Sequence, residues 1–259
     1  MSNAQQGSFL RQVAADMYHL AYRLTLPIKF VIFDFIYRSD SSLPPAKLRF
    51  RVTEQLSPQI YLETSRSTAG ALTSLLAYFK IRIGDATQAL DFGCGCGRTL
   101  RQLAGTGAQF TGVDIDAESV DWCKKNLNGM KFELSSELPP LPFPDQLFDL
   151  IYAVSVFTHL DFYHQQRWRD ELFRILKPGG MLVFTTHAEH IARKAQTDSS
   201  NLIFRKSKKL KGLMPDWYQT TFQSAESVVA SFSDVFERVE HVPKWFGDQD
   251  AYVAFKSKC

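Results

Sequence analysis

A short apolar segment that leads directly into a cluster of glycines constrains the fold of this chain more than any other feature of its sequence. Residues 88–92 are mostly apolar, and three glycines follow at alternate positions, Gly93, Gly95 and Gly97. This pattern predicts a strand, a glycine loop and a helix over 98–104. Glycines between a strand and a helix let a ligand approach the backbone and expose the free N–H groups of the helix.

The alternation of strand and helix signals continues along the chain. Further strands are predicted at 110–113, 130–134, 148–156, 181–185, 235–241 and 251–255. Helices are predicted at 117–127, 163–176 and 224–232. The nearly continuous apolar run over 148–156 is typical of a strand buried on both faces of a parallel sheet. We therefore predict an α/β fold with a doubly wound, Rossmann-like, mostly parallel sheet, in which the last two strands pair antiparallel at one edge.

The region before this sheet is predicted to be mainly helical, with a break at Pro44 and Pro45. We accordingly divide the chain into an N-terminal helical extension or cap, residues 1–83, and a sheet domain, residues 84–259. The apolar stretch 24–37 is too short and too charged to span a bilayer. We expect it to dock on the domain, and peripheral contact with a membrane surface is the alternative.

Composition narrows the class of protein. With 30 basic and 27 acidic side chains in 259 residues, the net charge of +3 excludes a strongly basic nucleic-acid binder. The first twenty residues lack a secretory signal pattern, which favours a cytoplasmic protein. Four cysteines are too few for a disulfide framework. Cys94 and Cys96 lack the partners of a zinc motif, so we predict passive loop residues and no metal.

The acidic residues around the glycine loop indicate the kind of ligand. The glycine spacing departs from the dinucleotide pattern Gly-x-Gly-x-x-Gly, and Asp91 just before the glycines disfavours a diphosphate. Asp114, at the end of the second predicted strand, is placed for a bidentate hydrogen bond to ribose hydroxyls. These features favour a nucleoside without phosphates. The plainer alternatives are a tight turn for the glycines and a helix cap for Asp114.

Several motifs in the same order resemble class I S-adenosylmethionine-dependent methyltransferases. They lie at 90–100, 110–116, 138–145 (LPPLPFPD), 148–160 (FDLIYAVSVFTHL), 171–172 and 176–180 (LKPGG). The resemblance covers about residues 88–186, and the flanking segments 43–45 and 247–250 resemble a bacterial branch of that family. It implies the seven-stranded methyltransferase fold and S-adenosylmethionine as the cofactor.

The resemblance also implies roles for individual residues. Asp91 and the three glycines would hold the methionine part of the cofactor, and Asp114 would bind the ribose hydroxyls. Ile115 would pack against the adenine. Glu137 would meet the adenine amino group, or is a solvated loop charge. Ser155, at the end of the fourth predicted strand, would lie beside the methionine chain and the reactive methyl group.

Two histidines are candidate catalytic bases. His159 and His187 follow neighbouring predicted strands, at the edge where open α/β sheets bind ligands. Either could accept a proton near neutral pH, although only some acceptors need a base. The alternative is that each merely packs or caps a helix.

Residues 193–222 form a basic insertion after the fifth predicted strand. Residues 193–211 hold seven basic side chains and one acidic side chain, Asp198. We interpret this insertion as a candidate lid over an anionic substrate, with a solvated loop as the alternative. Trp217, Tyr218 and Phe222 would line an acceptor pocket or belong to the core.

Together these features predict a methyltransferase that acts on a small molecule or on a glycan or lipid-linked acceptor. A cofactor-binding regulatory protein without catalysis is one alternative. A nicotinamide-dependent oxidoreductase is a weaker one, because the glycine spacing and Asp91 oppose it. The sequence gives no oligomeric state.

Overall fold

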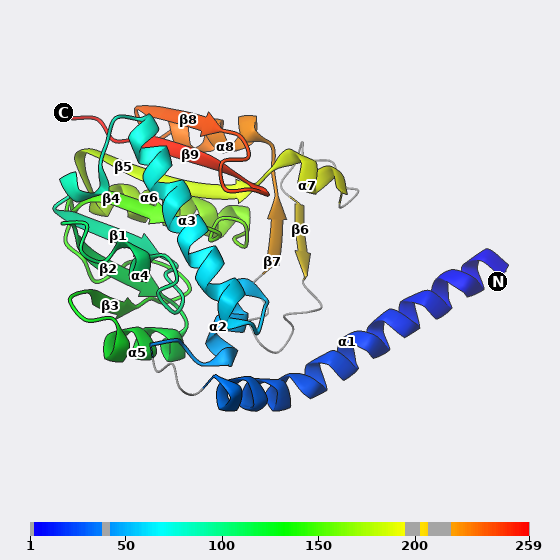
Figure 1. Cartoon of the computed structure of the whole chain (residues 1–259). Coiled ribbons are helices and arrows are strands. Elements are labelled where there is room, and N and C mark those ends of the chain that lie inside the picture. Colours follow the sequence, from blue (N-terminus) through cyan, green and yellow to red (C-terminus); the bar gives the residue numbers. More distant parts are fainter. Residues whose placement is uncertain (1–2, 38–41, 195–202, 207–218, 259) are drawn as a thin grey trace.

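The computed structural model describes residues 3–37, 42–194, 203–206 and 219–258, and its centre is a seven-stranded sheet (Figure 1). The strand order is β3-β2-β1-β4-β5-β9-β8. The strands are β1 (Gln88–Phe92), β2 (Gln109–Asp114), β3 (Lys131–Leu134), β4 (Phe148–Ala153), β5 (Leu176–His187), β8 (Arg238–Val242) and β9 (Gln249–Phe255). Strands β1 to β5 are parallel, and β9 runs antiparallel between β5 and β8. The predicted doubly wound sheet with an antiparallel edge is confirmed.

Helices cover both faces of the sheet. They are α3 (Pro58–Tyr78), α4 (Leu100–Leu103), α5 (Ala117–Asn126), α6 (Phe162–Ile175) and α8 (Ala225–Ser233). Strand β4 is apolar except for Asp149, because both of its faces are buried. Leu150 and Tyr152 belong to the core under α3 and α5, whereas Ile151 and Ala153 belong to the core under α6 and α8. Successive side chains of a strand point to opposite faces, so a strand with two buried faces has no polar face.

Several predicted boundaries were wrong. The strand predicted at 148–156 ends at Ala153, and the one predicted at 235–241 begins at Arg238. The helix predicted at 98–104 is reduced to α4, because the left-handed backbone of Gly95 and Gly97 continues the loop as turns through Thr99. Strand β5 begins at Leu176 rather than at residue 181. It includes the sequence 177–180, in which Gly179 has a positive φ. The pairing of β4 with β5 shifts register between Phe148 and Leu150 to accommodate it.

The N-terminal region consists of helices, as predicted. Helix α1 (Asn3–Ile36) precedes the break at the two prolines, and α2 (Ala46–Thr53) leads into α3. Figure 1 shows the N-terminal part of α1 extending away from the sheet. None of the helices in the described ranges combines the length and the apolar character needed to cross a membrane. The division at residue 83 stays a prediction.

The segment after β5 contains elements that the sequence patterns missed. Helix α7 (Glu189–Lys194) follows β5, and β6 (Ile203–Lys206) pairs antiparallel with β7 (Gln219–Phe222). Strand β7 is attached to the loop between β4 and α6, because Thr221 donates from its backbone N–H to Thr158 O and from its hydroxyl to Leu160 O, both at 2.8 Å. Most of the predicted lid, including Trp217 and Tyr218, lies outside the described residues.

Candidate active site

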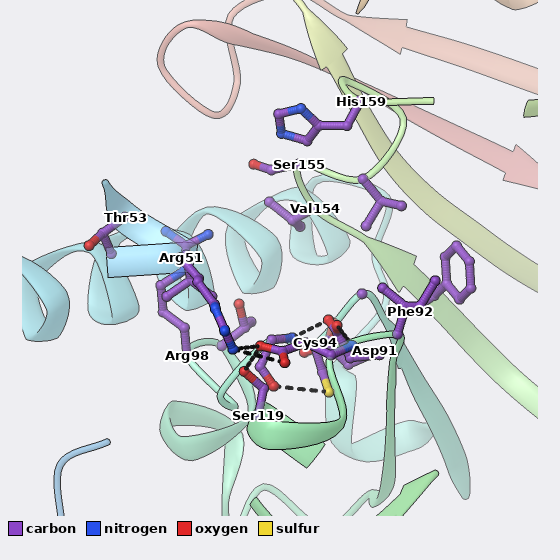
Figure 2. Close-up of a pocket in the computed structure, with 18 of the residues that line it drawn as sticks. Arg51, Thr53, Asp91, Phe92, Cys94, Arg98, Ser119, Val154, Ser155 and His159 are labelled. Atoms are coloured by element: carbon purple, nitrogen blue, oxygen red, sulfur yellow. Dashed lines mark hydrogen bonds and ion pairs between the residues drawn. The ribbon is translucent and has the colours of Figure 1, made fainter. Parts of the chain in front are cut away.

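A cleft of about 660 Å³ lies at the carboxyl edge of the parallel strands. The glycine loop and the candidate cofactor and catalytic residues of the other loops line it. Figure 2 shows its arrangement: Asp91 comes from β1 and Cys94 from the loop after it. Ser155 and His159 come from the segment after β4, and Arg51 and Thr53 from the end of α2. The sequence-predicted residues that line it are Asp91, Gly93, Gly95, Asp114, Ile115, Glu137, Ser155, His159 and His187.

The glycine loop has a left-handed backbone that favours glycine. Gly93, Gly95 and Gly97 have φ angles of +79°, +52° and +73°. A Cβ atom on Gly95 would collide with the Val52 side chain, and one on Gly97 would collide with Leu127. The glycines therefore serve two purposes, a left-handed turn and close packing, and they leave the loop backbone open to the cleft. Gly97 itself packs beneath the loop and does not line the cleft.

Asp114 fixes this loop to the end of β2. Its Oδ2 atom accepts the Gly95 N–H at 2.6 Å, and its Oδ1 atom accepts the Asp116 N–H at 2.8 Å. Burial raises the pKa of the Asp114 carboxyl, while these backbone donors oppose the rise. Each carboxylate oxygen keeps a lone pair for a further donor. The residue thus fits a pair of vicinal hydroxyl groups, and it also orders the glycine loop.

Asp91 is a buried carboxyl group at the bottom of the cleft. Burial raises its pKa to about 8, the nearby Asp114 adds to the rise, and Arg98 opposes it. A cationic ligand group beside Asp91 would favour its ionised form. The side chain therefore fits a ligand with an ammonium or sulfonium group better than one with a phosphate.

The adenine side of the cleft is less well defined. Ile115 and Glu137 both line it. The Glu137 carboxylate lies 3.3 Å from His164 Nε2 on α6, and the Trp168 indole donates to Glu137 O at 3.2 Å. These contacts hold the segment after β3 in place. The adenine contact of Glu137 stays a prediction.

A hydrogen-bonded group anchors Ser155. The Ser155 N–H donates to Thr185 Oγ1 at 2.8 Å, and the Thr185 hydroxyl donates to Gln249 Oε1 at 2.6 Å. Gln249 Nε2 in turn donates to the Ser155 hydroxyl at 2.8 Å. Ser155 has a φ of +63°, which is uncommon for a residue with a side chain. Three strand ends, those of β4, β5 and β9, therefore hold this one residue in a strained conformation.

Both candidate histidines lie in the cleft in their neutral form. His159 Nδ1 is 2.7 Å from the Gln219 carbonyl of β7, so this nitrogen carries the proton and Nε2 carries the lone pair. Burial lowers the pKa of His159 to about 4, and His187 adds to the effect. Burial also lowers the pKa of His187, whose ring stacks on Phe222 at 5.2 Å. An imidazole that is neutral at pH 7 has a lone pair for a proton, but its lowered pKa makes it a weaker base than an unperturbed histidine.

The cysteines of the glycine loop are buried. Cys96 Sγ lies 3.7 Å from the Tyr61 hydroxyl, and burial raises the pKa of Cys96 to about 12. Cys123 packs against the same loop from α5, with its thiol 3.6 Å from Gly95 O. Their packing supports the loop from below. Among the described residues, no group of three or more His, Cys, Asp and Glu side chains is placed to hold a metal ion.

Two contributors were missed by the sequence patterns. The end of α2 supplies Arg51, whose guanidinium lies 2.7 Å from Asp116 Oδ2 and 3.0 Å from Glu118 Oε2. Several cations alternate along this short helix, and no local signal shows which one faces the cleft. Gln249 lies in the segment 247–250, which the resemblance indicated without assigning a role.

Comparison with known proteins finds a methyltransferase domain in this chain. Residues 90–184 match the model of the methyltransferase domain family. The chain is 31% identical over 105 residues to the fatty-acid O-methyltransferase of Mycolicibacterium smegmatis, which covers 39% of this chain and 37% of that protein. It is 35% identical over 99 residues to the demethylmenaquinone methyltransferase of Tropheryma whipplei, which covers 37% of this chain and 40% of that protein. The chain thus matches well under half the length of these curated relatives.

Solved structures show the same fold. A possible histamine N-methyltransferase from Thermotoga maritima superposes with a TM-score of 0.53 at 17% identity, over 81% of this chain and 98% of that one. The N-methyltransferase NodS from Bradyrhizobium japonicum, in complex with S-adenosyl-L-homocysteine, gives a TM-score of 0.50 at 18% identity, over 76% of this chain and 87% of that one.

Residues 90–184 thus match a methyltransferase domain, and the sheet has the fold of solved S-adenosylmethionine-dependent methyltransferases. The residues of the cleft fit that cofactor. Asp91 suits its cationic methionine part, Asp114 suits its ribose hydroxyls, and the open glycine backbone suits close approach.

Proposed function

We propose that this protein transfers a methyl group from S-adenosylmethionine to a small, lipid-like acceptor. The single observation that carries the proposal is one cleft that holds both kinds of group: the carboxyls and glycines suited to the cofactor, and the Ser155 and His159 side chains after β4. The segment after β4 also lines the cleft with Val154, Val156 and Leu160, which suits an apolar acceptor.

The chain's own residues bind, orient and accept a proton. S-adenosylmethionine supplies a methyl group that its sulfonium already makes electrophilic, so the protein mainly aligns the acceptor. Asp91, Asp114 and the glycine loop would hold the cofactor. Ser155, fixed by Gln249, would hold its reactive end. His159 would accept the proton of an acceptor hydroxyl at Nε2, because Nδ1 donates to Gln219 O.

Two finer features of the acceptor belong to the same proposal. An anionic group on the acceptor is supported by the excess of basic side chains over residues 193–211. A lipid character is supported by the named substrates of the relatives, a fatty acid and demethylmenaquinone.

Calorimetry with S-adenosyl-L-homocysteine, followed by transfer of a radiolabelled methyl group, tests this function. The acceptor panel contains a long-chain fatty acid, a prenylated quinol, a lipid-linked glycan and a small amine. We expect binding of the homocysteine analogue and label on a lipid-like member. Binding of NADH without binding of the analogue would support an oxidoreductase. Binding of the analogue with no labelled acceptor would support a regulatory protein.

A further inference from the structure

One face of α1 carries large apolar side chains that are exposed to solvent. Four of them, at spacings of four, three and four residues, are exposed by 63–71%. At about 1.5 Å per residue, the whole row spans about 27 Å. We call this row the α1 stripe; its members are Met17, Leu20, Leu24, Ile28, Val31 and Phe35.

The opposite face of α1 is buried and fixes the orientation of the stripe. Leu26 and Phe30 pack in a small core with Ala46 and Phe50 of α2. The Asp34 carboxylate accepts the Ala46 N–H at 2.6 Å, which ties α1 to the start of α2. At 100° per residue, Leu26 and Phe30 lie on the side of the helix away from the stripe. The stripe therefore faces away from the small core that anchors the helix.

We propose that α1 lies on the surface of a lipid bilayer, with the stripe in the interface and α2 on the protein side. Because the other face of α1 packs on α2, the helix would contact the bilayer along one side only. An amphipathic helix that lies flat buries one apolar face in the boundary between head groups and acyl chains.

The width of the apolar face favours a bilayer over a second copy of the chain. A coiled-coil seam is narrow, and charged side chains usually flank it. Beside the stripe, Ile32 and Ile36 are also exposed, by 49% and 59%. The flanking carboxylate of Asp34 is already bound to the Ala46 N–H. The edge that carries Ile32 and Ile36 would therefore lack the charges that set the register of a paired seam.

Charge points to an anionic membrane. Residues 1–38 hold four basic and two acidic side chains. Such an excess beside an apolar face strengthens binding to anionic lipids. Lys29, on α1 itself, is half-buried, and its ammonium group lies 4.7 Å from the centre of the Tyr22 ring.

The position of α1 relates the bilayer to the cleft. Helix α1 packs on Phe50, and the next residues of α2, Arg51 to Thr53, line the cleft. A bilayer under α1 would thus lie on the α2 side of the cleft, from which a lipid-like acceptor could enter. This last step rests on the proposed function, whereas binding of α1 to the bilayer goes beyond it.

Flotation of the full chain with vesicles tests the inference. The vesicles contain phosphatidylcholine and phosphatidylglycerol in a 3:1 ratio, and pure phosphatidylcholine vesicles serve for comparison. We expect the native chain to float, more strongly with the anionic vesicles. A variant with Leu24→Glu and Val31→Glu should lose at least tenfold in partitioning. The matched control is Leu134→Glu, because Leu134 is also an exposed leucine, at the end of β3.

The outcomes separate this inference from the proposed function. Circular dichroism and binding of S-adenosyl-L-homocysteine without vesicles show that each variant is folded. A native chain that does not float, or equal flotation of the double variant, would overturn the inference. A stable dimer in light scattering that the double variant dissociates would instead make the stripe an interface between copies. Failure to bind the homocysteine analogue, with flotation intact, would overturn the proposed function alone.

Discussion

The two ends of the cleft are built in different ways. The cofactor end comes from one continuous stretch, in which the Gly95 N–H donates to Asp114 only nineteen residues away. The acceptor end, where the reactive methyl group of the cofactor would meet the acceptor, is assembled from distant segments: Ser155 is bonded to Gln249, and His159 to Gln219. The first end depends on local backbone geometry, and the second depends on packing between strands. Mutations should therefore affect cofactor affinity at one end and turnover at the other.

The largest effect is expected from Gly95→Ala. Its φ of +52° and the contact with Val52 leave no room for a methyl group, so affinity for S-adenosyl-L-homocysteine should fall more than about 100-fold, or about 2.7 kcal/mol. Gly105→Ala is the matched control, because Gly105 also has a positive φ, of +79°, but has open space around it. Calorimetry of both variants measures the difference. Equal losses would mean that backbone strain, rather than the site, causes the effect.

His159→Gln should affect the other end. The glutamine side chain can still donate to Gln219 O but is no base, so turnover should fall about 100-fold with an acceptor that must lose a proton. Cofactor affinity should stay within about twofold. Initial rates at saturating cofactor, together with calorimetry, give both numbers. Normal turnover would remove His159 from the mechanism.

Asp114→Ala should weaken binding of S-adenosyl-L-homocysteine by about 1.5–3 kcal/mol, because charge-assisted hydrogen bonds are lost. The variant also frees the Gly95 N–H, so the loop should exchange its amide hydrogens faster. Asp121→Ala, which removes an exposed carboxylate on α5, is the control for charge alone. Unchanged affinity in Asp114→Ala would refute the ribose assignment.

The smallest effect concerns pH and the stability of the acceptor end. His159 has a pKa of about 4 in the fold and about 6.5 when unfolded, so between these values only the unfolded chain binds the proton. Stability is therefore complete above pH 6.5 and decreases as the pH falls toward 4. From pH 7.5 to 5.5 the loss attributable to His159 is about 1.4 kcal/mol. Urea unfolding of the native chain and of His159→Gln measures it, and an identical pH dependence in the two would contradict the assignment.

The sequence predicted the sheet well, because each strand is a local apolar run bounded by turn residues. It placed β1, β4 and the final antiparallel pair, and it missed β6 and β7. The resulting strand pair packs on the loop after β4 through Thr221, a contact between residues sixty or more positions apart that no local pattern contains. The same limit applies to the site. Asp91 is close to the glycines and Asp114 is at the end of a strand, so local patterns identify both residues. No local pattern identifies Arg51.

The sequence by itself determined where most strands lie along the chain, where the glycine loop lies and which carboxyls stand at the cofactor end. Each of these depends on a few consecutive residues and their backbone preferences. Only the tertiary structure decided which nitrogen of His159 carries the proton, how Ser155 is held, and which face of α1 is buried. Those features depend on contacts between distant segments. In α1, for example, either apolar face of the helix could pack on α2 while the other stays exposed. The same sequence pattern allows both arrangements, and packing chooses between them.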